Sequence, residues 1–264
     1  MSDWQLRAIE KSIQELDIEY ALVVVNREAS ENGTERSGIL SRLIGLYRRR
    51  KFWGLIVIER TILNKIRGEN SLTEQLQSHD VSEVEVFSES TIISVEPEKE
   101  GAWYEFPEEA VDKVEQEADI AIRFGFGLIR GDILKAPSLG VLSFHPGDVT
   151  KHRGQGPERI FLEDMSMGVS TLQRLNDEVD SGEIVVQGET SVEDAYTYDQ
   201  VLYEIHELQS LLLTKGLKQM SCPEFEPEPP ETLGKYYSHA QRETLPYALR
   251  VLLKNISGRL KHLL

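Results

Sequence analysis

The chain has 264 residues, 40% of them hydrophobic, which is enough to bury a core in one large domain. Its formal net charge of −16 disfavours general affinity for nucleic acid, because phosphate binding needs a basic surface. The single cysteine, Cys222, excludes a disulfide within the chain. No apolar run reaches about 18 residues, and residues 1–11 lack the apolar centre of a secretory signal. We therefore expect a cytoplasmic protein without a transmembrane segment.

Helical and strand patterns alternate along the chain. The apolar periodicity predicts helices over residues 4–16, 37–52, 107–116, 169–179, 194–217 and 245–264. Short valine- and isoleucine-rich or alternating runs predict strands over residues 20–25, 84–87, 119–123, 141–144 and 183–186. Residues 55–58 are apolar but too few to separate helix from strand. This order predicts an α/β fold, doubly wound around a mainly parallel sheet, with a small C-terminal helical extension.

Positive charge gathers in one segment, residues 36–67. It holds nine Lys and Arg residues against Glu59 alone, so it carries +8 and the remainder of the chain carries −24. Three interpretations stay open: a solvated helix face beside acidic neighbours, a site for a phosphate-bearing acceptor, or a surface for a membrane or a partner.

The segment 140–187 holds the residues best suited to chemistry. His145, Asp148, His152 and Arg153 lie in a polar loop that follows a strand, and ligand sites in parallel sheets lie beyond the carboxyl ends of strands. Asp180 stands in an Asp-Ser-Gly turn just before another strand. Two titratable groups at such junctions are able to converge in one cleft.

Simpler roles for these residues are also open. His145 is a candidate for a loop histidine that only hydrogen-bonds backbone, and Asp180 for a turn former. His145, Asp148 and His152 together offer three metal ligands, but Pro146-Gly147 breaks a regular presentation, and we expect no metal.

Four stretches carry a family resemblance in a fixed order. They are Ser143-Phe144-His145, Lys151-His152-Arg153-Gly154, Gly168-Val169-Ser170 and Asp180-Ser181-Gly182-Glu183-Ile184. They resemble the Asn-x-His strand end, the Arg-Gly pair, the Gly-Val-Thr segment and the Asp-x-Gly turn of the folate-dependent formyltransferases. That family includes glycinamide ribonucleotide, methionyl-tRNA and nucleotide-sugar formyltransferases. The resemblance covers residues 118–187.

The resemblance implies an enzyme that uses 10-formyltetrahydrofolate as co-substrate and formylates an amine. His145, Asp180 and Ser143 would be catalytic, with the imidazole stabilising an oxyanion and Asp180 favouring its charged form. Phe124, Gly125, Phe126 and Val141 would border the folate. Asp148, His152 and Arg153 would bind the acceptor.

Two departures from the family pattern carry consequences. Ser143 stands where the family has an asparagine whose amide donates to the oxyanion. Three outcomes stay open: Ser143 takes that role directly or through a water, another group takes it, or the protein only binds its ligand. The usual first strand is not visible, which would leave two neighbouring strands with unpaired edges. The resemblance divides the chain into a catalytic domain, 1–190, and a helical extension, 191–264, with a proline-rich acidic linker at 221–231.

The expected activity is formyl transfer to an amine acceptor, with a small molecule or nucleotide-sugar favoured over nucleic acid. Two alternatives remain: a formyl-folate hydrolase on the same scaffold, and a non-catalytic folate- or nucleotide-binding protein. The oligomeric state is open.

Overall fold

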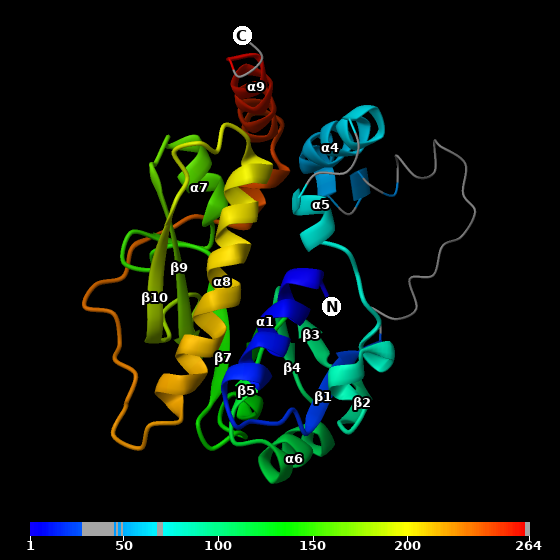
Figure 1. Ribbon diagram of the computed structural model, residues 1–264, viewed down its shortest axis with the longest axis vertical. Helices are drawn as coiled ribbons and strands as arrows, with labels where there is room; N and C mark the ends of the chain where they lie inside the picture. The colour runs from blue at the N-terminus through cyan, green and yellow to red at the C-terminus, as the bar shows by residue number, and fades with distance from the viewer. Residues whose placement is uncertain (28–44, 46, 49, 68–70, 262–264) are drawn as a thin grey trace.

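The computed structural model describes residues 1–27, 45, 47, 48, 50–67 and 71–261 (Figure 1). The helices are α1 (Asp3–Glu15), α4 (Gly54–Arg67), α5 (Ser71–Gln75), α6 (Glu108–Glu117), α7 (Pro157–Leu162), α8 (Tyr198–Met220) and α9 (Leu245–Lys261). The strands are β1 (Leu22–Asn26), β2 (Thr91–Val95), β3 (Glu98–Glu100), β4 (Trp103–Glu105), β5 (Ala121–Ile122), β6 (Leu128–Arg130), β7 (Val141–His145), β8 (His152–Arg153), β9 (Met167–Arg174), β10 (Glu183–Ser191) and β11 (Lys235–Tyr236). The predicted α/β class is confirmed.

The largest sheet has the strand order β10-β9-β7-β5. Its β5–β7 pairing is parallel, whereas β9 runs antiparallel to both β7 and β10. Parallel pairs also join β1 to β2, β4 to β6 and β8 to β11. Within the described ranges β1 pairs with β2 alone and β5 with β7 alone. The carboxyl ends of β5 and β7 therefore open side by side at one edge, where the loop after β7 begins.

Helix α8 covers the main sheet and lies beside α1 (Figure 1). Leu208, Leu212 and Leu213 of α8 pack into one core cluster with Leu142 of β7 and Leu172 of β9. The opposite face of the β5–β7 pair belongs to a second cluster that contains Val141 and Val114 of α6. The division of the chain at residue 190 stays a prediction, but α8, which follows that boundary, shares its core with the sheet that precedes it.

Two local predictions are wrong. Residues 84–87, expected as a strand, contain the 3-10 helix η3 (Glu85–Phe87), in which Phe87 is buried against Tyr20 while Val84 and Val86 pack partly on the same core. Residues 169–179, expected as a helix, contain the strand β9. β9 pairs with β7 and β10 along its two edges, and its consecutive residues 168–173 are buried, so polar residues occupy interior positions on this strand and hide the period of two.

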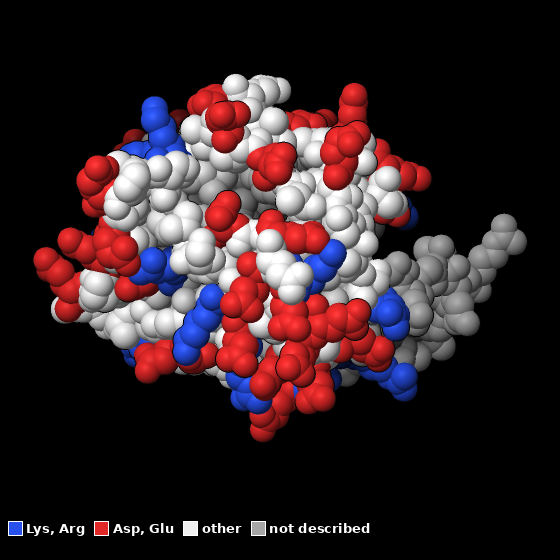
Figure 2. All heavy atoms as spheres, turned by 90° about the horizontal axis from the view of Figure 1, so that it is seen from below, with Lys and Arg blue, Asp and Glu red and all other residues white. Residues whose placement is uncertain are grey.

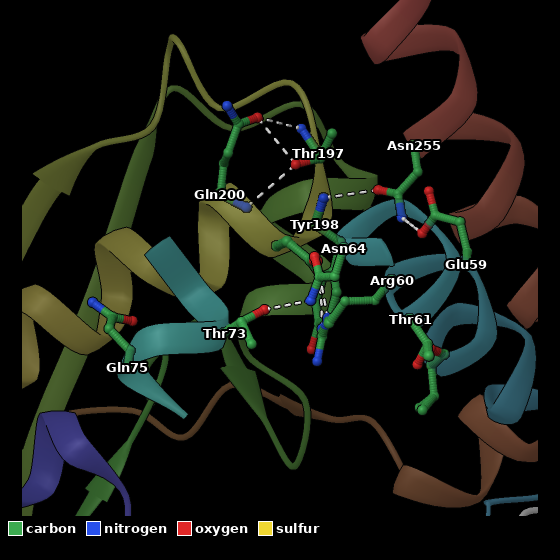
Figure 3. Close-up of polar contacts among 12 residues, drawn as sticks. Glu59, Arg60, Thr61, Asn64, Thr73, Gln75, Thr197, Tyr198, Gln200 and Asn255 are labelled. Atoms are coloured by element: carbon green, nitrogen blue, oxygen red, sulfur yellow. Dashed lines mark hydrogen bonds and ion pairs between the residues drawn. The ribbon is translucent and has the colours of Figure 1, made fainter. Parts of the chain in front are cut away.

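The basic segment 36–67 is described only in part. The helix expected over 37–52 falls largely outside the described residues, and Lys51–Trp53 forms the 3-10 helix η1. The undecided run 55–58 belongs to α4. Figure 3 shows how α4 is fixed: Arg60 donates to both carboxylate oxygens of Asp199, at 2.9 and 2.6 Å, and Asn255 links Glu59 to the backbone N–H of Tyr198. We call this set the α4–α8–α9 junction.

The segment between α8 and α9 returns to the side of the sheet that carries the loop after β7. Residues 221–231 form no regular helix or strand, and Ile184 of β10 donates its N–H to Glu228 O. Strand β11 then pairs with β8, which places residues 234–237 against the loop after β7. Among the described residues no helix is long and apolar enough to cross a bilayer.

Candidate active site

His145 is the last residue of β7, and Ser143 lies two residues before it on the same face of the strand. Ile122 of β5 pairs with Leu142, so Arg123, the next residue, lies beside Ser143. The carboxyl end of this parallel pair thus brings three polar side chains together. The prediction that this strand end carries the site rests on the same geometry.

His145 and Asp180 meet where the loop after β7 lies against the turn before β10. Their Nδ1 and Oδ2 atoms are 3.3 Å apart, the imidazole is 2% exposed and the carboxylate 19%. The other ring nitrogen, Nε2, lies 2.9 Å from the carbonyl oxygen of His152. Because a carboxylate and a carbonyl only accept hydrogen bonds, both contacts are satisfied together when the ring is an imidazolium.

The carboxylate of Asp180 is kept ionised by its surroundings. Burial alone would raise its pKa, but the His145 ring, the N–H of Gly154 and the nearby charge of Arg123 together lower it. The Gly154 N–H donates to Oδ2 at 2.6 Å. The pair therefore presents a fixed negative charge behind an imidazole, which is an arrangement suited to holding that ring in one orientation.

Two turns bring Asp180 to His145. Asp180 has φ +48°, and the side chain of Asn176 fixes its turn by donating to the carbonyl of Ser181 at 3.0 Å. Gly154 has φ +83°, and a Cβ there would meet the carbonyl oxygen of Tyr237 at 2.2 Å. Only glycine fits this position, because both its backbone conformation and its neighbour exclude a side chain.

Buried hydroxyl groups of β9 hold the loop that follows His145. Ser170 Oγ donates to the carbonyl of His145 at 3.1 Å, and Thr171 Oγ1 donates to the carbonyl of Gly147 at 2.9 Å. A Cβ at Gly147 would lie 2.8 Å from His145 Nε2, so this loop packs directly on the ring. The polar residues that disguised β9 in the sequence thus serve the site.

Arg123 is a site residue that the sequence did not single out. Its Nε and Nη2 donate to Ser143 Oγ at 3.1 and 2.8 Å. Burial lowers the pKa of the guanidinium, and Asp180 opposes that shift. No signal in the sequence alone marks this arginine, because only the pairing of β5 with β7 shows that it lies beside Ser143.

The three predicted acceptor-binding residues are engaged within the protein. Asp148 accepts from Thr150 N and Oγ1, at 3.0 and 2.6 Å, and lies 3.1 Å from Lys151 Nζ; burial opposes its ionisation, yet these bonds lower its pKa. His152 Nε2 lies 3.3 Å from Glu163, and burial lowers its pKa. Arg153 donates to the carbonyls of Gly234 and Val179, which ties β11 to the Asp180 turn. Their binding role stays a prediction.

The predicted folate-binding residues divide between two sides of the sheet. Phe124 packs edge-to-face on Trp4, with ring centroids 5.6 Å apart, whereas Phe126 packs on Phe106 at 5.0 Å. Val141 is 3% exposed and lies in the core beneath Ser143. Gly125 and Phe126, between and at these rings, both have positive φ, +88° and +50°, and the role of this loop in folate binding stays a prediction.

Two further features bear on ligand classes. In the part of the chain that the structure describes, no group of three or more His, Cys, Asp or Glu is placed to hold a metal ion, and this includes His145, Asp148 and His152. A cavity of about 590 Å³ lies between α4, α5 and the start of α8, lined by Asn64, Tyr196 and Tyr203 among others, away from His145.

A family model described as formyl transferase matches residues 67–217, more than half of the chain and including Arg123, Ser143, His145 and Asp180. The chain belongs to the formyl transferase family.

Individual relatives are distant. The methionyl-tRNA formyltransferases of Rickettsia prowazekii and Thermotoga maritima are 28% and 32% identical over 108 and 111 residues, 40% and 41% of this chain. The matched segment spans only 35% of the length of either relative. Among solved structures, a sugar N-formyltransferase from Shewanella superposes with a TM-score of 0.48 at 14% identity, covering 88% of both chains. The formyltransferase PseJ of Anoxybacillus kamchatkensis gives 0.47 at 17% identity, covering 61% of this chain and 80% of its own.

Proposed function

We propose that this protein transfers a formyl group from 10-formyltetrahydrofolate to the amine of a small acceptor. The observation that carries the proposal is the His145–Asp180 pair, 3.3 Å apart at the carboxyl end of β7, with the carboxylate held ionised. Such a pair suits acyl transfer to an amine, because the imidazole can donate a hydrogen bond to an oxyanion and a fixed anion lies behind it.

In this reaction a bond forms between the amine nitrogen and the formyl carbon. The bond from that carbon to N10 of the folate breaks, and one proton passes from the attacking amine to the leaving nitrogen. The folate supplies an activated formyl carbonyl; the chain supplies orientation, charge and the proton path. His145 donates a hydrogen bond to the carbonyl oxygen as negative charge develops on it. In this proposal Asp180 holds the ring and relays the proton.

The Nε2 atom of His145 is the donor that would face the substrate. In the structure it is bound to the carbonyl of His152, so a substrate oxygen has to take the place of that carbonyl. Hydrogen bonds of this kind commonly tighten or exchange when the substrate binds. The loop over residues 146–156, which packs on the ring through Gly147, is the segment that would adjust.

The surface charge favours a small acceptor over a nucleic acid. Figure 2 views the end of the molecule that carries α6, where acidic side chains predominate. The exposed acidic residues of α6 include Glu108, Glu109, Asp112 and Glu115. With a net charge of −16, such a surface repels a polyanion, so the proposed acceptor is a small amine, including one linked to a nucleotide.

The proposal is tested with 10-formyltetrahydrofolate carrying a labelled formyl group and a panel of UDP- and dTDP-linked amino sugars and free amino sugars. We expect label in a formamide product and release of tetrahydrofolate only when an amine is present. Labelled formate in the absence of any amine would instead identify a hydrolase. Saturable folate binding with no turnover would identify a binding protein, and either result contradicts the proposal.

A further inference from the structure

Arg123 presents a positive charge that the protein does not neutralise by an ion pair. No carboxylate of the residues that the structure describes lies within ion-pair distance of its guanidinium, in contrast to Arg60 with Asp199 and Arg174 with Glu183. Its only hydrogen-bond acceptor among the same residues is Ser143 Oγ, which receives Nε–H and one N–H of Nη2. A guanidinium has five N–H donors, so three are left for another acceptor.

The cost of this arrangement points to a ligand. The guanidinium is half-buried and burial lowers its pKa, which means that removing this charge from water is unfavourable to folding. A partly buried guanidinium that donates to a hydroxyl group instead of a carboxylate contributes little to the stability of the fold, so stability alone does not explain its position. Such a charge is favourable when an oxygen that carries negative charge shares the site.

The strand pairing places Arg123 on the face of the sheet that carries His145. Arg123 lies beside Ser143 because β5 and β7 pair in parallel, and Ser143 and His145 project from one face of β7. The charge of Arg123 also reaches Asp180, the partner of His145. An oxygen that accepts a hydrogen bond from His145 would therefore lie in the field of the guanidinium.

Ser143 connects the two groups. Its hydroxyl oxygen accepts both bonds from Arg123, which leaves its own hydrogen free to donate. A hydroxyl that accepts from a cation is a stronger donor, since hydrogen bonds in a chain polarise one another. Ser143 and Arg123 would thus act as one unit.

We propose that Arg123, acting with the hydroxyl of Ser143, stabilises the negative charge that develops on the formyl oxygen during transfer. This inference rests on the proposed formyl transfer and adds a guanidinium to the site of His145. It makes Arg123 a group that contacts the reacting oxygen, and it makes Ser143 the residue that positions it.

A binding experiment tests the contact without knowledge of the acceptor. The probes are 10-formyl-5,8-dideazafolate, a stable analogue that carries the formyl group, and 5,8-dideazafolate, which lacks it. For Arg123→Met we expect calorimetry to show about tenfold weaker binding of the formyl analogue and little change for the other, because a charged hydrogen bond to the carbonyl is lost. Arg130→Met is the matched control, since Arg130 is exposed and pairs with Glu100 and Glu105 at the edge of the molecule.

Kinetics with the best amine of the panel give the second readout. We expect Arg123→Met to lower kcat about 100- to 1,000-fold with little change in the KM of the amine, the loss typical of one oxyanion donor. Arg123→Lys keeps the positive charge but not the two parallel N–H donors, so its kcat should lie between those of the wild type and Arg123→Met. If Arg123→Met does not fold by circular dichroism, Arg123→Lys decides by the same binding ratio.

The outcomes separate this inference from the proposed function. If His145→Asn abolishes transfer while Arg123→Met matches Arg130→Met in kcat and in the binding ratio, the inference is wrong and the proposed function stands. Equal weakening of both folate analogues would show a structural role and would also overturn it. If the wild-type protein neither binds the formyl analogue nor transfers formyl, both proposals fall.

Discussion

Two places in the described part of this molecule hold buried charge and treat it differently. At the α4–α8–α9 junction the guanidinium groups of Arg60 and Arg259 face the carboxylates of Asp199 and Glu59, at 2.6 and 3.0 Å. At the end of β7, Asp180 faces an imidazole and a backbone N–H, and Arg123 faces only a hydroxyl. At the junction each of these guanidinium groups is paired with a carboxylate of the protein. At the β7 site, by contrast, N–H donors of Arg123 are left for an acceptor outside the protein. Loss of a partner should therefore cost stability at the junction and turnover at the site.

The largest effect is expected from the site. Asp180→Asn keeps the shape of the turn but removes the charge behind His145, so kcat should fall about 1,000-fold, within the range of general acid–base catalysis. Steady-state rates of tetrahydrofolate release measure it. Asp177→Asn, on the exposed part of the same turn, is the control and should keep wild-type kcat. Equal rates for Asp180→Asn and Asp177→Asn would remove Asp180 from the mechanism.

At the junction the expected loss is in stability. Asp199→Ala leaves the Arg60 side chain, 21% exposed, without its carboxylate, and should lower the free energy of unfolding by about 3 kcal/mol. Urea denaturation measures it. The double variant Arg60→Met/Asp199→Leu should recover most of that loss, because no unpaired charge remains. A loss under about 1 kcal/mol in Asp199→Ala would mean that water already solvates this pair.

A third expectation concerns pH. His206 is stacked on Trp4, with ring centroids 4.8 Å apart, and burial lowers its pKa to about 4. The unfolded chain binds this proton at about pH 6.5, so stability is full above that value and falls as pH drops from about 6.5 to 4, by roughly 3 kcal/mol in total. His206→Asn should flatten this part of the profile of unfolding free energy against pH. An unchanged profile would assign the acid sensitivity to other groups.

The smallest effect is expected at the start of α8, within the junction. Thr197 caps this helix, where Gln200 N donates to its Oγ1 at 3.3 Å and the Gln200 side chain accepts from Thr197 N at 3.1 Å. Thr197→Ala should lower the free energy of unfolding by about 1 kcal/mol, and Thr197→Ser, which keeps the oxygen, by less. Turnover per folded molecule should not change in either variant. A lower kcat would couple the junction to the site and weaken the contrast between them.

The sequence predicted the chemistry-bearing end of β7 better than its surroundings. His145 and Asp180 could be predicted because each stands in a short motif, and the order of motifs placed both at strand ends. Arg123 could not, because its role depends on the β5–β7 register. β9 resembles a helix in the sequence because Ser170 and Thr171 are buried polar residues whose hydrogen-bond partners lie elsewhere in the chain. The apolar periodicity of a sequence shows which apolar residues are buried. It therefore does not identify a strand whose buried residues are polar, as at this site.

The paired action of His145 and Asp180 is tested most directly by a double-mutant cycle on kcat with His145→Asn, Asp180→Asn and both together. Residues that act as a unit are strongly non-additive, so the double variant should be no slower than the slower single variant. Losses that multiply would instead show that the imidazole and the carboxylate contribute independently, and the account of the site given above would be contradicted.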